Sequence, residues 1–518
     1  MTLLAAITRF KSFGACSNAA GGIRRQRCWR MFSSNIGASK VERRYGKVHA
    51  CIIAGEPSGD VIGGNLIESL RNLSGGNIIV SGVGGKRMEH AGLSKSAVSL
   101  DDIAVMGTIE LVGKLYKLHK CVNKVVDHLI EAKPDVIVAI DAKGFNKAVL
   151  KRYFKRLYGN ADRTAVLSTK KLEPRPPPTI QYVAPSYWAY KSSSKDKPKE
   201  LLAYFEKAYC ILPFEVQALE ACNVPSLFVG HPAVEEMIKL FDCRDLLGGE
   251  MNYLDSLRQS IARRRSSASE KFGISSCSGY DEKVLLLFPG SRMQEVEKSL
   301  PLLLDVLKRF PQDHGESLEE NQSANTLWTI LVPTLSKNTA VGHKVSEFVN
   351  KCNNDKVLSA YVKKIMYIDN DSMDFKRDAF AAADAAIAMS GTVVTELALA
   401  NIKTLVIYPG SYLTGAIAKR LAKVNNVSIP NILANQPLID ELLFDECNVD
   451  NLTAKARELL ADCEGPGQQS KVGDAINDPL LDTSLLSLLN NGSMPSEIAA
   501  MDVLKLANEY RNSVCRDI

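Results

Sequence analysis

The chain has 518 residues, of which 46% are hydrophobic and 24% charged, and its formal net charge is +6. This composition is typical of globular proteins and excludes disordered and fibrous classes, while the length predicts two or three domains. No apolar run approaches the roughly 18 residues that a membrane-spanning helix needs. The twelve cysteines include no C-x-x-C pair and the seven histidines are dispersed, so the sequence predicts neither a disulfide framework nor a metal site.

The first 41 residues differ from the rest, because they are rich in basic and small residues and contain no acidic residue before Glu42. With the segment RMFS at residues 30–33, this composition is typical of a mitochondrial transit peptide cleaved after Phe32, and a disordered basic tail is the alternative. Residues 1–32 carry six basic side chains, and taking these from +6 leaves a formal charge of about zero. The net charge therefore gives no support for nucleic-acid binding, and we predict none.

Residues 49–54 (HACIIA) are typical of a buried strand, and the loop GEPSGD at residues 55–60 leads into a helix that runs to about residue 70. Ser58 is a candidate N-cap of this helix. The loop lacks the dinucleotide spacing G-x-G-x-x-G, and the carboxylate of Glu56 would repel a pyrophosphate. Glu56 therefore suits a sugar hydroxyl or proton transfer. Alternatively, Glu56 caps the helix and Asp60 lies in its first turn, where both favour the helix dipole.

Residues 77–83 predict a second strand. Residues 135–140 (DVIVAI) predict a further, buried strand, and Asp141 stands at its end. Ligands of open α/β sheets bind at the carboxyl ends of the strands, so Asp141 is well placed to accept a proton, with capping of the next helix as the alternative. Residues 179–184 predict another strand, followed by PSYWAY at residues 185–190, whose aromatic side chains line an acceptor pocket or fill the core.

Residues 101–118 carry apolar side chains on more than one helical face. The segment is therefore either a helix buried on two sides or an apolar flap that faces lipid, flanked by Lys114, Lys117 and Lys120.

In the second half, residues 285–288 predict a strand that Pro289 and Gly290 end, and a helix begins at about Met293. The N–H groups of such a turn suit a phosphate, which Arg292 can clamp with two hydrogen bonds. Residues 385–389 followed by the segment SGT at residues 390–392 repeat this arrangement. Two such turns indicate a nucleotide diphosphate.

Glu396 lies one turn into the helix that follows, where it can bind both hydroxyls of a ribose or lie on a solvated surface. Residues 427–433 (VSIPNIL) place Asn431 in a predicted loop. The predicted organisation is an α/β protein with a leader at residues 1–32, α/β domains at 46–235 and 283–440, a linker or insertion at 236–282, and a helical segment at 441–518.

Ten motifs match, in order, those of the lipid-A-disaccharide synthase family; they are residues 54–60, 82–88, 102–107, 133–146, 179–189, 212–215, 228–232, 289–296, 390–396 and 427–434. The chain therefore resembles an inverting GT-B glycosyltransferase, whose two Rossmann-like domains face a central cleft and whose C-terminal helices cross back to the first domain. The resemblance implies transfer from UDP-2,3-diacylglucosamine to 2,3-diacylglucosamine 1-phosphate (lipid X), without metal or cofactor. The products are the β-1′,6-linked disaccharide 1-phosphate and UDP.

The resemblance also implies a role for each candidate residue. Asp141 is the first candidate for the catalytic base and Glu56 the second, while Arg292 stabilises the leaving diphosphate. The candidate substrate-binding residues are Ser58, Asp60, Asn146 and Tyr187 in the first domain, and Ser390, Gly391, Thr392, Glu396 and Asn431 in the second.

The resemblance further implies a peripheral protein on the matrix side of the mitochondrial inner membrane, with residues 101–118 as the lipid-facing flap, and a homodimer that exchanges C-terminal segments. Gly144 stands where bacterial members often have a second Asp. Another GT-B enzyme, such as a UDP-N-acetylglucosamine epimerase, is not expected to share the segments AGEPSGD and AIDAKGFN. A non-catalytic protein that binds a UDP-sugar or an acylated glucosamine is the alternative.

Overall fold

The computed structural model describes residues 47–94, 96–104, 111–159, 163–168, 175–189, 197–244, 252–274, 281–309, 326–369, 372–410, 426–461, 479–489 and 492–514. The predicted transit peptide and its cleavage site lie outside these residues. So do residues 105–110 of the predicted flap.

The first lobe is built on a six-stranded sheet with the strand order β2-β1-β3-β4-β5-β6. The neighbouring strands from β1 to β6 pair in parallel. The strands are β1 (Val48–Ala54), β2 (Ile78–Val83), β3 (Val136–Ile140), β4 (Thr179–Tyr182), β5 (Lys207–Cys210) and β6 (Ser226–Phe228). The chain moves outward from β1 to β2 and then continues on the other side of β1 with β3, so the strand order reverses between β1 and β3.

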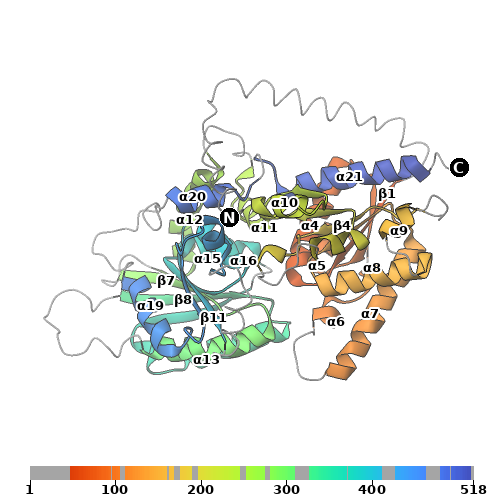
Figure 1. Ribbon diagram of the computed structural model, residues 1–518. Helices are drawn as coiled ribbons and strands as arrows, with labels where there is room; N and C mark the ends of the chain where they lie inside the picture. The colour runs from red at the N-terminus through yellow and green to blue at the C-terminus, as the bar shows by residue number, and fades with distance from the viewer. Residues whose placement is uncertain are drawn as a thin grey trace, which may run out of the picture. The chain divides into compact units, whose positions relative to one another are not determined.

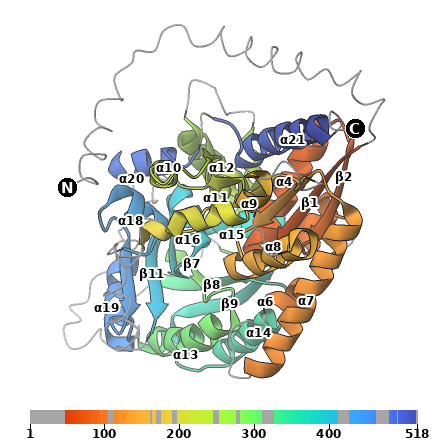
Figure 2. The same ribbon diagram turned by 45° about the vertical axis from the view of Figure 1, so that its right-hand side comes forward.

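Helices cover both faces of this sheet because successive strand residues point to opposite sides. Cys51 and Ile53 pack with α7 (Leu111–Ala132) and α8 (Lys143–Tyr158) in one apolar cluster. On the other side lie α4 (Pro57–Leu73) and the C-terminal helix α21 (Pro495–Val514), which pack together (Figure 2). The remaining helical segments of this lobe are α5 (Lys86–Ala91), α6 (Leu100–Ala104), α9 (Arg163–Ser168), η2 (Tyr187–Ala189), η3 (Lys197–Ala203), α10 (Pro213–Glu220) and α11 (Pro232–Leu240).

The second lobe is built on a six-stranded sheet with the order β12-β11-β10-β7-β8-β9, in which every pairing is parallel. Its strands are β7 (Asp281–Phe288), β8 (Thr326–Thr334), β9 (Val362–Asp369), β10 (Ala385–Met389), β11 (Lys403–Pro409) and β12 (Asp440–Phe444). Here the order reverses between β7 and β10. The α/β prediction with two Rossmann-like sheets is confirmed.

The alternation of side chains along β7 shows how the second sheet is covered. Leu286 and Phe288 pack with α12 (Tyr253–Lys271), α15 (Met373–Ala382) and α16 (Thr392–Leu399). Leu285 and Leu287 pack with α13 (Met293–Arg309), α14 (Ala340–Asn353) and α19 (Val449–Ala461). Figure 1 shows α13 and α19 on one side of the strands and α15 and α16 on the other. A strand buried on both faces needs a continuous apolar run, which is what this segment of the sequence contains.

Several elements differ from the sequence prediction. Of the predicted helix or flap at residues 101–118, the structure describes the end of α6, at Ala104, and the start of α7, at Leu111. The predicted linker contains α12, whose apolar side belongs to the second core. Asn431 lies in a short helix, α18 (Ile429–Ala434), and not in a loop. Past residue 440, β12 and α19 complete the second lobe before α20 (Pro479–Leu486) and α21 follow.

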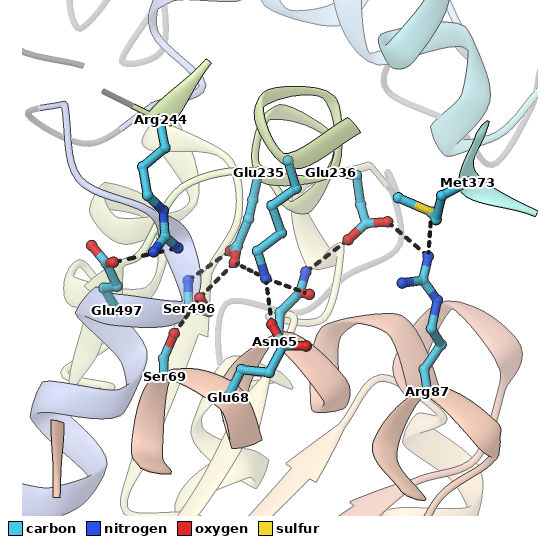
Figure 3. A network of polar contacts seen from close by, with 11 residues as sticks. Asn65, Glu68, Ser69, Arg87, Glu235, Glu236, Arg244, Met373, Ser496 and Glu497 are labelled. Atoms are coloured by element: carbon cyan, nitrogen blue, oxygen red, sulfur yellow. Dashed lines mark hydrogen bonds and ion pairs between the residues drawn. The ribbon is translucent and has the colours of Figure 1, made fainter. Parts of the chain in front are cut away.

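A polar network fastens α21 to the first lobe (Figure 3). Glu235 of α11 accepts hydrogen bonds from the backbone N and the hydroxyl of Ser496, at 2.9 and 2.6 Å. The Ser496 hydroxyl also bonds Ser69 of α4 at 2.7 Å, and Asn65 of α4 donates to Glu236 of α11 at 2.9 Å. The final helix is therefore tied to both α4 and α11. In the part of the chain that the structure describes, no helix is both long enough and apolar enough to cross a bilayer.

Candidate active site

The two acidic candidates of the first lobe lie at the point where its strand order reverses. Ala54 at the end of β1 is paired with Ile140 at the end of β3, so Glu56 and Asp141 leave neighbouring strands at the same edge. Ligands of open α/β sheets bind at this position. The parallel register therefore brings together two carboxylates that are 85 positions apart in the sequence.

The backbone at Asp141 is strained and held in place by side chains. Asp141 and Ala142 have φ angles of +47° and +33°, in a region that non-glycine residues rarely adopt. The amide of Asn146 donates to the carbonyls of Ile140 and Asp141, at 3.2 and 2.9 Å, and Gln181 also donates to the Asp141 carbonyl at 3.2 Å. Such strain costs on the order of 1–3 kcal/mol per residue and collects at functional sites. These amides therefore keep the Asp141 carboxylate in a defined position.

Burial raises the pKa of Asp141 above its usual value, and the negative charge of Glu56 raises it further. The positive charges of Lys143 and Arg292 act in the opposite direction. Burial lowers the pKa of Lys143, which the carboxylates of Asp141, Glu215 and Glu56 counteract. A carboxylate with a raised pKa is a stronger base than a solvated one, which suits it to accept a proton from a hydroxyl.

Arg292 of the second lobe contacts Glu56 of the first. One terminal guanidinium nitrogen lies 2.7 Å from Glu56 Oε2 and the second lies 3.2 Å from Glu295 Oε1, while 68% of the Arg292 side chain is exposed. Arg292 follows β7 just as Glu56 follows β1. The contact therefore brings the reversal points of both sheets together.

The turn before α13 differs from the phosphate cradle that the sequence predicted. Glu295 Oε2 accepts the backbone N–H groups of Ser291 and Arg292, at 3.0 and 3.2 Å. Gly290 has a φ of +119°, and a Cβ there would lie 2.6 Å from Glu295 Cβ. The carboxylate thus reaches back over a glycine and accepts two N–H groups that directly precede α13, as the glutamate of a capping box does. Of the groups that were predicted to bind a phosphate here, the exposed Arg292 side chain stays accessible.

The second predicted turn is open. The N-cap of α16 is Gly391, which has no side chain to accept the first N–H groups of the helix. Both Gly391 and Thr392 are exposed. The backbone N–H of Ser390 donates to the Ile407 carbonyl at 3.0 Å, which fixes the start of the turn. Glu396 lies one turn further on and forms an ion pair with Lys376 at 2.9 Å. This turn therefore offers backbone donors beside a carboxylate.

The chain is similar to proteins of one known family. Residues 50–262 and 253–478 match the model of a family described as lipid-A-disaccharide synthetase. The chain belongs to this family. It is similar to an Arabidopsis thaliana protein named "Probable lipid-A-disaccharide synthase, mitochondrial", with 31% identity over 80% of each chain. It is also similar to the lipid-A-disaccharide synthase of Rhodospirillum centenum, with 32% identity over 88% of this chain and 94% of that one.

Membership of the lipid-A-disaccharide synthetase family agrees with the GT-B prediction, since two parallel Rossmann-like sheets are present. It makes the chain a glycosyltransferase.

Candidate residues such as Asp60 form hydrogen bonds within the protein itself. Asp60 accepts the backbone N–H groups of Gly85, Arg87 and Met88, so it joins α4 to the start of α5. Ser58 is not the N-cap: that position belongs to Glu56, and Ser58 is the exposed second residue of α4. A substrate contact by Asp60 or Ser58 stays a prediction.

Asn431 is fully buried, and its side chain uses all its hydrogen-bonding positions. Its oxygen accepts the N–H groups of Leu438 and Ile439, and its amide nitrogen donates to the Ile439 carbonyl and to Glu441. Glu441 also accepts from Val427 N and from the N and hydroxyl of Ser428. Asn431 therefore organises this segment of the lipid-A-disaccharide synthetase fold, and a nucleotide contact by Asn431 stays a prediction. Tyr187 is half-buried and packs against the core of the first lobe.

Sequence reasoning missed three residues that shape the site. Gln181 is a polar residue inside a buried strand, which was a usable signal. Glu295 stands at the capping-box spacing from Arg292, which was a second one. Lys376 is 20 positions from Glu396 in sequence, and only the packing of α15 beside α16 reveals it.

Proposed function

We propose that this lipid-A-disaccharide synthetase family member transfers 2,3-diacylglucosamine from UDP-2,3-diacylglucosamine to 2,3-diacylglucosamine 1-phosphate. The products are the β-1′,6-linked disaccharide 1-phosphate and UDP. The observation that carries the proposal is the 2.7 Å contact between Arg292 and Glu56, because it brings a cation suited to a diphosphate beside the carboxylates suited to a hydroxyl. Family membership supports the same reaction.

The second lobe binds the donor in this proposal. Arg292 and the open start of α16 at Ser390, Gly391 and Thr392 hold the diphosphate, and Glu396 accepts hydrogen bonds from the ribose hydroxyls. As the anomeric C–O bond breaks, negative charge grows on the leaving UDP. Fixed donors stabilise that charge, and the loss of one typically costs about 10²–10³ in rate.

The first lobe binds the acceptor. The 6-hydroxyl oxygen attacks the anomeric carbon from the side opposite the diphosphate, which inverts the configuration, while Asp141 takes its proton. Asn146 acts through Asp141, since its amide holds the strained backbone, and Glu56 raises the pKa of Asp141. Tyr187 packs beside the acceptor sugar.

We also propose that the protein binds the surface of a mitochondrial membrane, because both substrates carry acyl chains. Tyr116 near the start of α7 is 72% exposed, and its neighbours Lys117 and Lys120 are exposed as well. An exposed aromatic ring flanked by cations suits an anionic membrane surface. The Arabidopsis thaliana relative is named mitochondrial, which supports the location. We further propose that the protein forms a homodimer that exchanges its C-terminal helices.

The test is a transfer assay on the protein from residue 33 onward, with both acylated substrates in mixed micelles. Wild-type protein should release UDP and the disaccharide in equal amounts, whereas Asp141→Ala and Arg292→Ala should lose most of this activity. Asp127→Asn is the matched control, because Asp127 is an exposed acid of the same lobe on α7. No disaccharide from the wild-type protein would contradict the proposal and favour a protein that only binds its ligands.

A further inference from the structure

Lys376 of α15 reaches across to Glu396 of α16. Its Nζ lies 2.9 Å from Glu396 Oε2, and the two side chains are only 15% and 11% exposed. A glutamate side chain has three rotatable bonds, and fixing them costs entropy that a ligand must otherwise supply. An ion pair that is mostly shielded from water fixes the carboxylate before any ligand arrives.

The lysine is itself held by an aromatic side chain. Its Nζ lies 5.7 Å from the centre of the Phe380 ring, within the range of a cation–π contact. Phe380 packs edge-on against Phe288, at 6.0 Å between ring centres. Phe288 is the last residue of β7, directly before the turn that carries Arg292. A continuous set of contacts thus connects the carboxylate on α16 with the strand that leads to Arg292.

We propose that Lys376 is a positioning residue for the recognition of ribose. It binds one oxygen of Glu396 and turns the other toward the 2′- and 3′-hydroxyls of the donor nucleotide. This inference rests on the proposed function, because it assumes that the second lobe binds UDP. A lysine that served only to join α15 to α16 would affect stability and not distinguish between nucleotides.

A second ion pair on α15 offers a matched control. Lys271 of α12 pairs with Asp378 of α15 at 2.5 Å, and its Nζ lies 4.2 Å from the centre of the Phe375 ring. This second set contains the same three kinds of side chain as the first, but its carboxylate is on α15 and not on α16. Lys271→Met therefore removes an equivalent cation without touching Glu396.

The experiment is calorimetric titration of the mature full-length chain with UDP and with 2′,3′-dideoxy-UDP, which lacks both ribose hydroxyls. Lys376→Met should bind UDP about 10- to 100-fold more weakly, the usual range for losing a charged hydrogen bond, and bind the dideoxy analogue within about twofold of wild type. Lys376→Arg should recover most of the affinity for UDP, and Lys271→Met should change neither ligand. Lys376→Gln replaces the Met variant if the latter does not fold.

Equal losses for both ligands, or no loss for either, would overturn the positioning role. Glu396→Gln separates this failure from that of the proposed function. Wild-type protein that binds UDP and the dideoxy analogue equally, with Glu396→Gln unchanged, would refute the ribose assignment and leave UDP binding intact. Wild-type protein that binds no UDP would refute both.

Discussion

The two lobes have the same layout but opposite chemistry at the point where their strand order reverses. In the first lobe, the loops after β1 and β3 carry the carboxylates of Glu56 and Asp141. In the second lobe, the loops after β7 and β10 carry Arg292 and the uncapped start of α16. The fold thus supplies two equivalent positions, and in the proposed function the residues there make one a site of proton transfer and the other a site of anion binding.

The backbone conformations of the loop after β3 and of the turn after β7 also differ. Two consecutive non-glycine residues have positive φ at Asp141 and Ala142, whereas in the turn before α13 the positive φ of +119° belongs to Gly290. In the proposed function, this strain lies where the Asp141 carboxylate must meet a proton within hydrogen-bond distance. Glycine relieves it where Arg292 would attract an anion, because that interaction acts over a longer range.

The largest effect is expected in the first lobe, from Asp141→Asn. The amide keeps the shape of the side chain but cannot accept the proton, so kcat should fall by about 10²–10⁴ while the affinity for UDP stays within about twofold. Transfer assays and UDP titration on the same preparation measure the two quantities. If kcat is retained, Asp141 is not the base, and the comparison between the lobes loses its catalytic half.

Unlike Asp141→Asn, Arg292→Ala in the second lobe should weaken donor binding as well as the rate. We expect kcat/KM for the donor to fall by about 10²–10³, because a fixed cation at the diphosphate is lost. Arg292→Lys should recover part of this loss, since lysine keeps the charge but not the two parallel hydrogen bonds. A loss confined to the acceptor KM would place Arg292 on the wrong substrate.

Sequence reasoning predicted which strands end at the candidate residues, because strands and turns have local signatures. The apolar runs before Glu56, Asp141 and Arg292 predicted the strands, and parallel topology then brings their carboxyl ends together. It failed where the partner of a residue is set by packing alone. The ion pair between Lys376 and Glu396 has no local pattern, because it depends on how α15 packs beside α16.

Two further differences come from local capping signals in the sequence. The sequence analysis predicts Asn431 in a loop after Pro430, yet proline at the first turn of a helix is favourable and α18 forms there. The capping of the turn at Ser291 by Glu295 removed backbone donors that the sequence had left open for a phosphate.

A third prediction concerns His231, which lies between β6 and α11. His231 is fully buried as the N-cap of α11, its Nδ1 accepts the N–H of Ala233, and burial lowers its pKa from 6.5 to about 4. The folded state must keep this imidazole neutral, so its stabilisation is complete above pH 6.5 and is lost as the pH falls toward 4. The full loss amounts to about 3 kcal/mol.

The matching variant is His231→Asn, because asparagine is also a good N-cap and does not titrate. As the pH falls from 6.5 to 4.5, the thermal midpoint of the variant should rise relative to that of the wild type. From pH 7 to 8 the difference between the two midpoints should stay constant. A difference that is independent of pH would show that His231 does not titrate in this range.

The smallest effect should come from Glu56→Gln, and it separates the two candidate bases. Removing the charge of Glu56 lowers the raised pKa of Asp141, so the acid limb of the pH–rate profile should move to lower pH while the plateau kcat remains. The same change frees Arg292 from a competing carboxylate, so UDP should bind up to about fivefold more tightly, the range expected for an exposed ion pair. Glu68→Gln, an exposed acid on the same helix, should change neither quantity. Loss of the plateau would instead make Glu56 the base, because a residue that only tunes Asp141 cannot abolish the proton transfer.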